Sequence, residues 1–480
     1  MRILVTGANG YVGSKLVPKL VRKGHEVTCM VRNRARISDA APAGARFVEA
    51  DALNAADLAP ALVGIDVAYY LIHSMAGDTA GFAQRDRDAA CNFATAAKRA
   101  GVQRIIYLGG LTSQTSTASL HLKSRQETGA VLRQFGPPVT EFRAGIIVGN
   151  GSVSFEMIRY LTERLPVMIC PRWVVTRTQP IAISNVLEYL VAALDIPESA
   201  GEIIEIGGAS VEQYRTMMLT YARARGLRRW LLRVPVLTPR LSSYWLNLVT
   251  PISAAIARPL IDGLRTEVVC TSAAAARLFP AICPVSYSEA VGAALDRPVP
   301  DESFQHLLPE NAGHASIRRE GLISDVRQAS VNAPAEQVFA VLQRLGGQRG
   351  WLYANILWQF RGWLDELLGG VGMRRGRSSD GPLKPGGYVD FWRVEQVICP
   401  RSLLLRAEMK LPGRAWLQFL LTPHDDGRTR LTCWAWFEPR GLAGEVYWWL
   451  LYPIHYLIFQ GMVRAIQTRS EESFKALARG

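Results

Sequence analysis

Short apolar runs typical of strands alternate with longer helical stretches over residues 1–194. The predicted strands are Ile3–Thr6, Glu26–Val31, Arg46–Ala50, Val67–Ile72, Arg104–Leu108 and Val139–Val148. The predicted helices between them are Tyr11–Lys23, Asp57–Leu62, Phe82–Ala100 and Ser124–Phe135. Because strands that alternate with helices pair in parallel, these residues are predicted to form an α/β domain around a doubly wound parallel sheet.

Residues 195–300 depart from this alternation. They contain one more predicted strand, Glu202–Ile206, and a helix over about Val211–Arg225. Four prolines then interrupt the apolar stretch between residues 235 and 259. We predict that this segment is a small cap that contributes a substrate pocket, because such folds bind ligands beyond the carboxyl ends of their strands.

A second domain is predicted over residues 321–480, after a linker over residues 301–320. Alternating apolar and polar positions predict antiparallel strands at Ile323–Val331, Tyr388–Val397, Ser402–Lys410, Trp416–Thr422 and Arg430–Phe437. Two helical stretches, Pro334–Leu345 and Tyr447–Leu477, complete the pattern. This order predicts an α+β domain in which a curved sheet grips a long C-terminal helix.

Two windows, Leu241–Ala257 and Val446–Val463, contain no charged residue. Both are at the lower limit of about 17–25 residues for a membrane span, and each contains a proline and polar side chains. We interpret them as buried core or pocket wall, and contact with a membrane surface or a full span stay open as alternatives.

Charge and cysteine content narrow the class of protein. The 55 Lys and Arg against 41 Asp and Glu give a net charge of +14, but no recognition motif for nucleic acid accompanies it. The seven cysteines include no C-x-x-C pair, so neither a disulfide framework nor a metal site is expected. With no signal peptide at Met1, we expect a cytoplasmic protein, and contact with the inner membrane stays open.

A glycine-rich turn, T-G-x-x-G-x-x-G, joins the first predicted strand to the first predicted helix. Gly7 allows the tight turn, Gly10 leaves room for a diphosphate, and Gly13 allows the helix to pack closely on the sheet. Free N–H groups and the positive end of the helix would bind the phosphates. The motif predicts a dinucleotide site in a Rossmann sheet.

Arg32, with Arg34 and Arg36 nearby, ends the second strand, where an NAD-preferring site usually carries a carboxylate. Because a guanidinium matches a 2′-phosphate, we expect NADP(H), with NAD as the alternative. Asp51 is placed to accept a hydrogen bond from the adenine amino group or else to cap a helix. The predicted cofactor contacts are Gly7, Asn9, Gly10, Tyr11, Val12, Gly13, Arg32, Asp51, Ala52, Ile72 and Gly109.

The motifs in residues 1–300 resemble the atypical, extended short-chain dehydrogenase/reductase superfamily, and its NmrA-like and complex-I-subunit-like branches are the most similar. The resemblance rests on the loop T-G-A-N-G-Y-V-G, the turn Glu49-Ala50-Asp51, the run Arg143–Gly149 and the tetrad Glu205-Ile206-Gly207-Gly208. It implies an NAD(P)-binding oxidoreductase with an extended-type substrate segment.

The superfamily's reductases carry Tyr-x-x-x-Lys on the helix after the fifth strand, and this sequence departs from that pattern. His121 stands at the tyrosine position and Arg125 at the lysine position. Imidazole can act as a general acid, whereas arginine can only hold a ribose or phosphate. Ser113 or Thr112 would polarise a carbonyl. We therefore predict His121, Arg125 and Ser113 as catalytic candidates, and a non-catalytic, cofactor-lining role for His121 stays open.

Residues 321–480 resemble a domain of unknown function that often follows such Rossmann units in bacteria. Matching motifs include Gly350-Trp351, Asp390-Phe391-Trp392-Arg393 and Met409–Gly413. The fold is similar to the START/polyketide-cyclase helix-grip group, whose members enclose apolar ligands. The resemblance implies a pocket for an apolar molecule. Three tryptophans are expected in its wall or in the core: Trp392, Trp434 and Trp436.

Several polar residues of this domain are expected to have structural roles. Arg393, Glu395, Arg406 and Glu408 alternate with apolar residues and are expected to face solvent or pair across strands. His455 is expected to be a hydrogen-bonded helix histidine rather than a ligand or acid.

Together these features predict an NADP(H)-binding oxidoreductase that acts on an apolar carbonyl or quinone-like molecule, held with help from the C-terminal pocket. The loss of Tyr-x-x-x-Lys keeps a different class open, a non-catalytic NADP(H) sensor or assembly module. A lipid-binding protein with a structural Rossmann unit is a third alternative. The expected partner is a small apolar molecule and not a nucleic acid.

Overall fold

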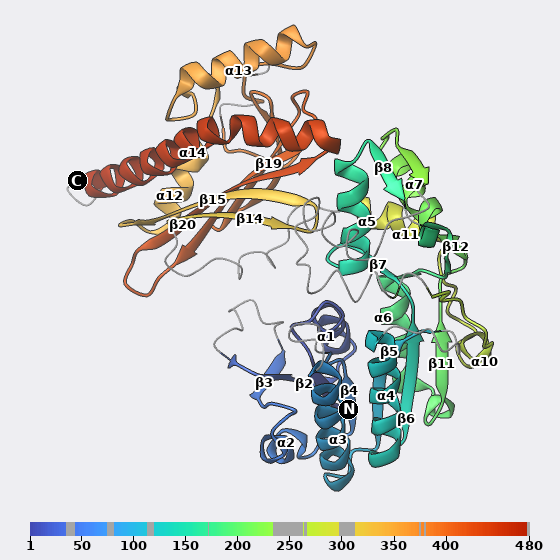
Figure 1. Cartoon of the computed structure of the whole chain (residues 1–480). Coiled ribbons are helices and arrows are strands. Elements are labelled where there is room, and N and C mark those ends of the chain that lie inside the picture. The colour runs from blue at the N-terminus through green and yellow to red at the C-terminus, as the bar shows by residue number, and fades with distance from the viewer. Residues whose placement is uncertain are drawn as a thin grey trace. The chain divides into compact units, whose positions relative to one another are not determined.

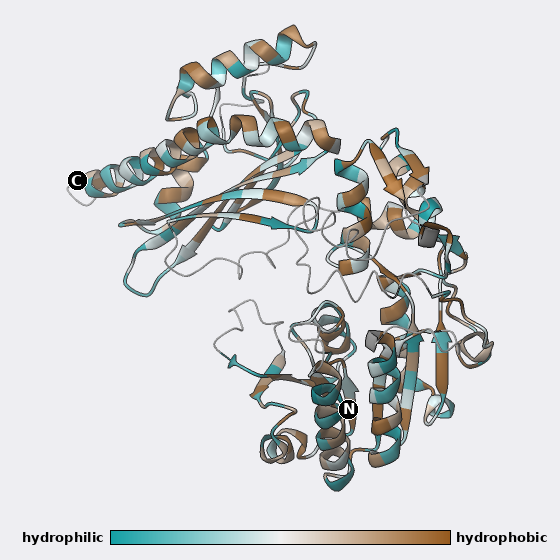
Figure 2. Ribbon diagram, viewed as in Figure 1, coloured by the Kyte–Doolittle hydropathy of each residue, from teal (hydrophilic) through white to brown (hydrophobic). Residues whose placement is uncertain are grey.

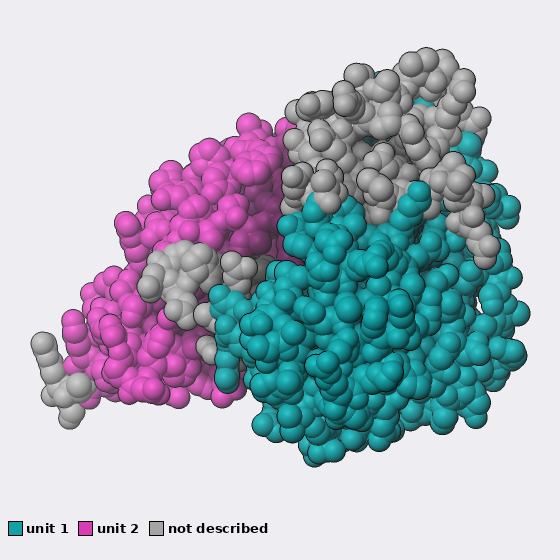
Figure 3. Space-filling view, turned by 60° about the horizontal axis from the view of Figure 1, so that its bottom comes forward, with its two compact units in different colours: residues 1–306 teal, residues 307–480 magenta. Residues whose placement is uncertain are grey.

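The protein divides into two compact units, Met1–His306 and Leu307–Gly480 (Figure 3). The computed structural model describes residues 1–34, 44–73, 81–112, 120–170, 172–233, 263, 266–296, 313–373, 376–378 and 381–477. The first unit contains a seven-stranded parallel sheet, and the second contains a seven-stranded antiparallel sheet. The uncharged window Leu241–Ala257 lies outside the described residues.

The parallel sheet of the first unit has the strand order β11-β6-β5-β4-β1-β2-β3 (Figure 1). Its strands are β1 (Arg2–Thr6), β2 (Glu26–Val31), β3 (Ala45–Glu49), β4 (Val67–Tyr70), β5 (Arg104–Gly110), β6 (Val139–Ala144) and β11 (Ile203–Ile206). The main helices around it are α1 (Gly13–Arg22), α2 (Ala55–Leu62), α3 (Phe82–Arg99), α4 (Leu120–Phe135) and α6 (Ile183–Ala192). The predicted doubly wound sheet is confirmed, and its order reverses between β1 and β4.

Each face of this sheet has its own hydrophobic core, because successive side chains of a strand point to opposite faces. Ile3 and Val5 of β1 pack with α1 and α6 on one face. Leu4 packs with α2 and α3 on the other face. The strands are therefore apolar almost throughout, as expected for a sheet that is covered on both sides.

Short strands and helices form a smaller layer of the first unit with a core of its own. Its strand pairs are β7 (Ile147–Val148) with β10 (Ile181–Ala182), β8 (Val167–Cys170) with β13 (Trp230–Arg233), and β9 (Arg177–Thr178) with β12 (Glu212–Gln213). Its helices are α5 (Val153–Arg164), α7 (Tyr214–Ala224) and α11 (Tyr287–Leu295), whereas α10 (Ala274–Leu278) packs in the core of the parallel sheet. These elements come from both sides of residue 194, where the sequence analysis placed a boundary.

The antiparallel sheet of the second unit has the strand order β14-β15-β20-β19-β18-β17-β16. Its strands are β14 (His314–Arg319), β15 (Leu322–Val331), β16 (Tyr388–Val389), β17 (Trp392–Ile398), β18 (Ser402–Ala407), β19 (Gly413–Pro423) and β20 (Thr429–Pro439). Residues 314–319, expected in the linker, form β14 instead, because they pair along their whole length with β15.

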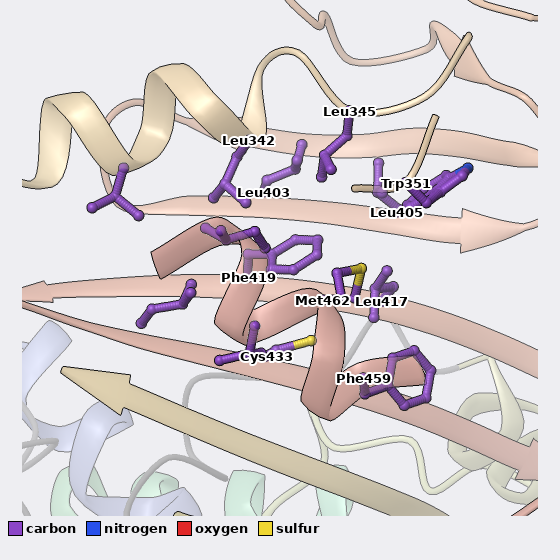
Figure 4. Packing of buried hydrophobic residues seen from close by; sticks show 14 of the residues in the cluster. Leu342, Leu345, Trp351, Leu403, Leu405, Leu417, Phe419, Cys433, Phe459 and Met462 are labelled. Carbon is purple, nitrogen blue, oxygen red and sulfur yellow. The ribbon is translucent and has the colours of Figure 1, made fainter. Parts of the chain in front are cut away.

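Helices α12 (Ala335–Leu342) and α14 (Gly441–Leu477) pack on this sheet, with α14 contacting β15 and β20. Figure 4 shows the core between them, where Phe459 and Met462 of α14 meet Leu417 and Phe419 of β19. A long C-terminal helix against an antiparallel sheet is consistent with the predicted helix-grip arrangement. The sequence pattern did not predict helix α13 (Asn355–Leu367).

The expected roles of the charged strand residues are confirmed by cross-strand ion pairs. Arg406 lies 3.1 Å from Glu395, and Arg393 lies 3.6 Å from Glu408. The tryptophans at 392, 434 and 436 are buried. None of the helices in the described part of the chain has the length and apolar character that a transmembrane segment requires.

His455 lies in α14 as expected, but the expected hydrogen bonding is wrong for its Nδ1 atom. Within the described structure, that buried nitrogen has no hydrogen-bond partner. The ring packs against Trp448 and Phe459 instead, at centroid distances of 5.4 and 5.5 Å. Burial and the nearby Arg361 guanidinium lower the pKa of His455 to about 4, so the ring is neutral at pH 7.

Asp325 and Arg327 form a buried ion pair on β15, and each residue is 1% exposed. A guanidinium nitrogen of Arg327 donates to Asp325 at 2.9 Å, and Nε2 of His314 lies 3.1 Å from the same carboxylate. The Arg327 guanidinium also lies 4.6 Å from the ring of Tyr456 in α14. The pair therefore connects the edge of the sheet to the long helix.

Replacing Arg327 with methionine should destabilise the second unit by about 3–5 kcal/mol, because the buried Asp325 carboxylate would lose its guanidinium and keep only His314, at 3.1 Å, as an ionic partner. The double variant Asp325→Leu/Arg327→Met should recover most of that loss. Urea unfolding followed by tryptophan fluorescence measures both, since nine of the twelve tryptophans lie between residues 351 and 449. Equal losses in the single and double variants would contradict the role given to the charge.

Candidate functional site

The glycine-rich loop between β1 and α1 folds so tightly that side chains are excluded at two of its glycines. Gly7 has a φ of +63°, and a Cβ atom there would lie 2.8 Å from the carbonyl oxygen of Leu71. A Cβ atom on Gly13 would lie 2.3 Å from the carbonyl oxygen of Gly7. The first turn of α1 therefore rests directly on the loop, as the motif predicted.

At the positive N-terminal end of α1, neither a capping side chain nor an acidic side chain of the helix competes with a bound anion. Its N-cap residue, Val12, makes no side-chain hydrogen bond, and the first turn contains no acidic residue. Lys15 adds a positive charge there, with its Nζ atom 5.4 Å from the centre of the Tyr11 ring. This end of the helix is suited to an anion.

A cavity of about 710 Å³ opens beside this loop at the carboxyl ends of β1, β2 and β4. The predicted cofactor residues that line it are Gly7, Asn9, Gly10, Arg32, Asp51, Ala52 and Ile72. Four other predicted residues, Tyr11, Val12, Gly13 and Gly109, do not line it. Gly109 lies in β5, while the other three support the loop and the start of α1.

Arg32 and Asp51 lie on the wall formed by the ends of β2 and β3. The Arg32 side chain is exposed, and the backbone N–H of the neighbouring Arg34 donates to Glu49 at 3.1 Å. Arg36 lies outside the described residues. Asp51 is not the helix cap that was considered as an alternative, because Asn54 caps α2.

Sequence reasoning missed a histidine–aspartate pair in the wall of the cavity. His73 follows β4, and its Nδ1 atom lies 3.1 Å from Oδ2 of Asp86 in α3. Asp86 is 4% exposed and also accepts a hydrogen bond of 3.4 Å from the hydroxyl of Ser124 in α4. The buried carboxylate thus holds the imidazole in one orientation.

Burial, Asp86 and Arg125 all act on the pKa of His73, and together they lower it. Burial of the ring has the largest effect and favours the neutral form. The hydrogen bond with Asp86 opposes this, while the positive charge of Arg125 lowers the pKa further. His73 is therefore neutral at pH 7, with a proton on Nδ1 when it donates to Asp86.

The predicted catalytic residues are described only in part. Ser113 lies outside the described residues, and so does the side chain of His121, whose backbone belongs to α4. Arg125 donates to the carbonyl oxygen of Leu108 at 3.2 Å, so its guanidinium lies at the carboxyl end of β5. Thr112, just beyond β5, is buried.

The cavity has further lining residues that the glycine motif does not reveal: Met30, Asn33, Leu53, Leu71, His73, Arg85 and Ala89. Most follow a strand directly or face one from α3. A histidine three residues after a buried strand was the available signal, since ligands bind beyond the carboxyl ends of parallel strands. Its partner Asp86 was not recognisable, because only the fold brings α3 to that point.

Two family models match separate parts of the chain. Residues 7–136 match the model described as NAD(P)H-binding. Residues 319–462 match the model described as Protein of unknown function (DUF2867). The expected domain of unknown function is thereby confirmed, whereas its likeness to START domains stays a prediction.

Curated relatives match the N-terminal part. A photosystem II assembly factor of Cyanophora paradoxa is 24% identical over 240 residues, which are 49% of this chain and 72% of that protein. A 3-beta-hydroxysteroid dehydrogenase of Mycolicibacterium neoaurum is 36% identical over 117 residues. That match covers 22% of this chain and only 31% of the dehydrogenase.

Solved structures are similar to the same region. An NADPH-dependent quinone oxidoreductase of Escherichia coli, complexed with NADPH, has a TM-score of 0.50 and is 20% identical, covering 61% of this chain and all of that chain. A triphenylmethane reductase of Citrobacter sp. has a TM-score of 0.50 and 17% identity, with 62% and 100% covered. Residues 7–136 therefore match an NAD(P)H-binding model within a Rossmann-type sheet, and residues 319–462 match the DUF2867 model.

Proposed function

We propose that the first unit binds NADP(H) and reduces an apolar carbonyl or quinone-like molecule. One observation carries this proposal: a single cavity is lined by the glycine-rich loop, by Arg32 and by His73, whose ring is held by buried Asp86. The first two features suit a phosphorylated dinucleotide, and the third is a group able to move a proton.

The cavity residues fit such a cofactor at three points. The positive end of α1 and the side-chain-free surface at Gly10 suit a diphosphate. Arg32 suits a 2′-phosphate, because a guanidinium donates parallel hydrogen bonds to phosphate oxygens. Asp51 has one carboxylate oxygen bonded to the backbone N–H of Leu53 at 3.0 Å and can accept from an adenine amino group through the other.

The reaction needs a hydride and a proton, and NADPH supplies the hydride when bound. In this proposal, protonated His73 donates a proton to the oxygen of the reduced carbonyl or quinone and becomes neutral. Asp86 positions the ring and favours its charged form. His73 would thus replace the missing tyrosine, with His121 as the competing candidate and Arg125 as a binding group for ribose or phosphate.

A second candidate function is a non-catalytic NADP(H)-binding assembly or sensor module. The residue that stands in place of the usual lysine favours this non-catalytic function. Arg125 donates a hydrogen bond to the backbone carbonyl of Leu108 and cannot lose its proton at neutral pH. Relatives named as photosystem II assembly factors are consistent with this class. Nucleotide binding without turnover of any carbonyl or quinone would favour it over the reductase.

Isothermal titration calorimetry should show tighter binding of NADPH than of NADH. Arg32→Gln should weaken NADPH binding about tenfold to a hundredfold and change NADH binding by less than about threefold, because one charge-assisted phosphate contact is lost. Gly13→Ala should weaken both, since its Cβ would meet the Gly7 carbonyl. Tighter NADH binding would refute the preference for NADP(H), and no heat with either nucleotide would refute the proposal.

The pH dependence of NADPH oxidation with a quinone or apolar carbonyl should identify the proton donor. The value of kcat/KM should fall as the pH rises through the pKa of His73, which lies below the ordinary value of 6.5, because the neutral ring no longer carries the transferable proton. His73→Asn should remove this decline and lower kcat about 10²–10⁴-fold.

Substitutions at two residues near His73 should shift the pH at which kcat/KM declines, in opposite directions. Asp86→Asn should move it to lower pH, because Asp86 raises the pKa of His73, and Arg125→Gln should move it to higher pH. His121→Ala is the matched comparison. If His121→Ala abolishes the decline and His73→Asn leaves it in place, His121 is the acid and the assignment to His73 is wrong.

A further inference from the structure

Helix α13 leaves a row of large apolar side chains in solvent. Ile356, Phe360, Trp363 and Leu367 follow one another at intervals of four, three and four residues, so they lie on one face of the helix. All four are exposed, from 57% for Trp363 to 80% for Ile356. The opposite side of α13 is buried through Trp358 and Asp365.

The first half of α14 exposes a second row of the same kind. Val446, Leu450 and Leu457 are exposed along one side of this helix, and Trp449 is exposed next to them. The side that faces the sheet is buried and includes Phe459. Brown hydrophobic segments recur along α13 and the N-terminal half of α14 in Figure 2.

Contacts within the second unit connect the two helices. A Cβ atom on Gly461 of α14 would lie 2.2 Å from the ring of Tyr353, which directly precedes α13. Arg361 of α13 is close enough to lower the pKa of His455 in α14. We call the exposed residues Ile356, Phe360, Trp363, Leu367, Leu450 and Leu457 the α13–α14 apolar face. Rows of exposed large apolar side chains, unlike single scattered ones, mark surfaces that contact a partner or a membrane.

Among the described residues of α13 and the first half of α14, Asp365 and Glu445 are buried and Glu366 is half-buried. Asp365 is buried and accepts backbone N–H groups, and Glu445 is buried in an ion pair with Arg318. The Nζ atom of Lys410 lies 2.9 Å from the carbonyl oxygen of exposed Leu368, at the end of α13. Residues 307–480 hold 22 Lys and Arg against 16 Asp and Glu.

We propose that the α13–α14 apolar face docks on the surface of an anionic lipid bilayer, with the two helices lying in the interface and not crossing it. Apolar side chains would enter the acyl boundary, while Trp363 and Trp449 would lie at the level of the head groups. The basic excess of this unit complements anionic head groups. This inference is independent of the nucleotide site and assigns a role to the second unit.

The test is flotation of the full-length protein with vesicles of phosphatidylcholine alone or with about one-third phosphatidylglycerol. The protein should float with the anionic vesicles, and binding should weaken with added salt and with neutral vesicles. The double variant Leu450→Glu/Leu457→Glu should reduce partitioning at least about tenfold, because two exposed leucines that would enter the acyl boundary become charged.

A matched control carries the same two charges elsewhere. Val63→Glu/Leu232→Glu changes residues of the first unit that are 75% and 56% exposed, against 75% and 60% for Leu450 and Leu457. This control changes the net charge by the same amount as the test variant but leaves the α13–α14 apolar face intact, so it should bind vesicles within about twofold of the unchanged protein. Circular dichroism and NADPH titration should show that both double variants stay folded.

Three results would overturn the proposal. The first is a failure of the unchanged protein to float with anionic vesicles. The second is an equal loss of binding in both double variants, which would mean that net charge alone matters. The third is a dimer that Leu450→Glu/Leu457→Glu dissociates while vesicle binding is absent, which would assign the face to a second copy of the chain.

Discussion

The close contact between the start of α1 and the loop before it is the constraint on which the candidate site depends. A methyl group on Gly13 would meet the Gly7 carbonyl at 2.3 Å, so the helix can begin there only because no side chain is present. This packing holds the start of α1 against the loop whose residues Gly7, Asn9 and Gly10 line the cavity. Arg32 and His73 reach the same cavity because their strands, β2 and β4, flank β1 in the parallel sheet.

The two units bury their apolar residues in different ways. The first unit covers both faces of a parallel sheet and leaves a cavity at the strand ends that both polar and apolar residues line. The second fills the space between its sheet and α14 with side chains, Trp351 among them, and leaves apolar residues of α13 and α14 in solvent. The second unit thus has large apolar side chains on its surface as well as in its core.

A bilayer contact and a reductase for an apolar molecule are compatible roles, because apolar carbonyls and quinones partition into membranes. The two proposals nevertheless rest on separate residues. His73 and Asp86 bear on proton transfer, whereas Leu450 and Leu457 bear on lipid binding. A failure of either proposal would leave the other standing.

Local sequence determined the elements near the cofactor loop, because their signals are short-range: β1 ends at Thr6, glycines follow at fixed spacing, and Arg32 ends the next strand. Pairing of Arg406 with Glu395 was also predictable from alternation along strands. Only the tertiary structure decided that Asp86, thirteen residues from His73, would hold its ring, since α3 must fold back over the sheet. It also decided which apolar residues of α13 and α14 stay exposed, because periodicity identifies a face, but only packing determines whether another element covers it.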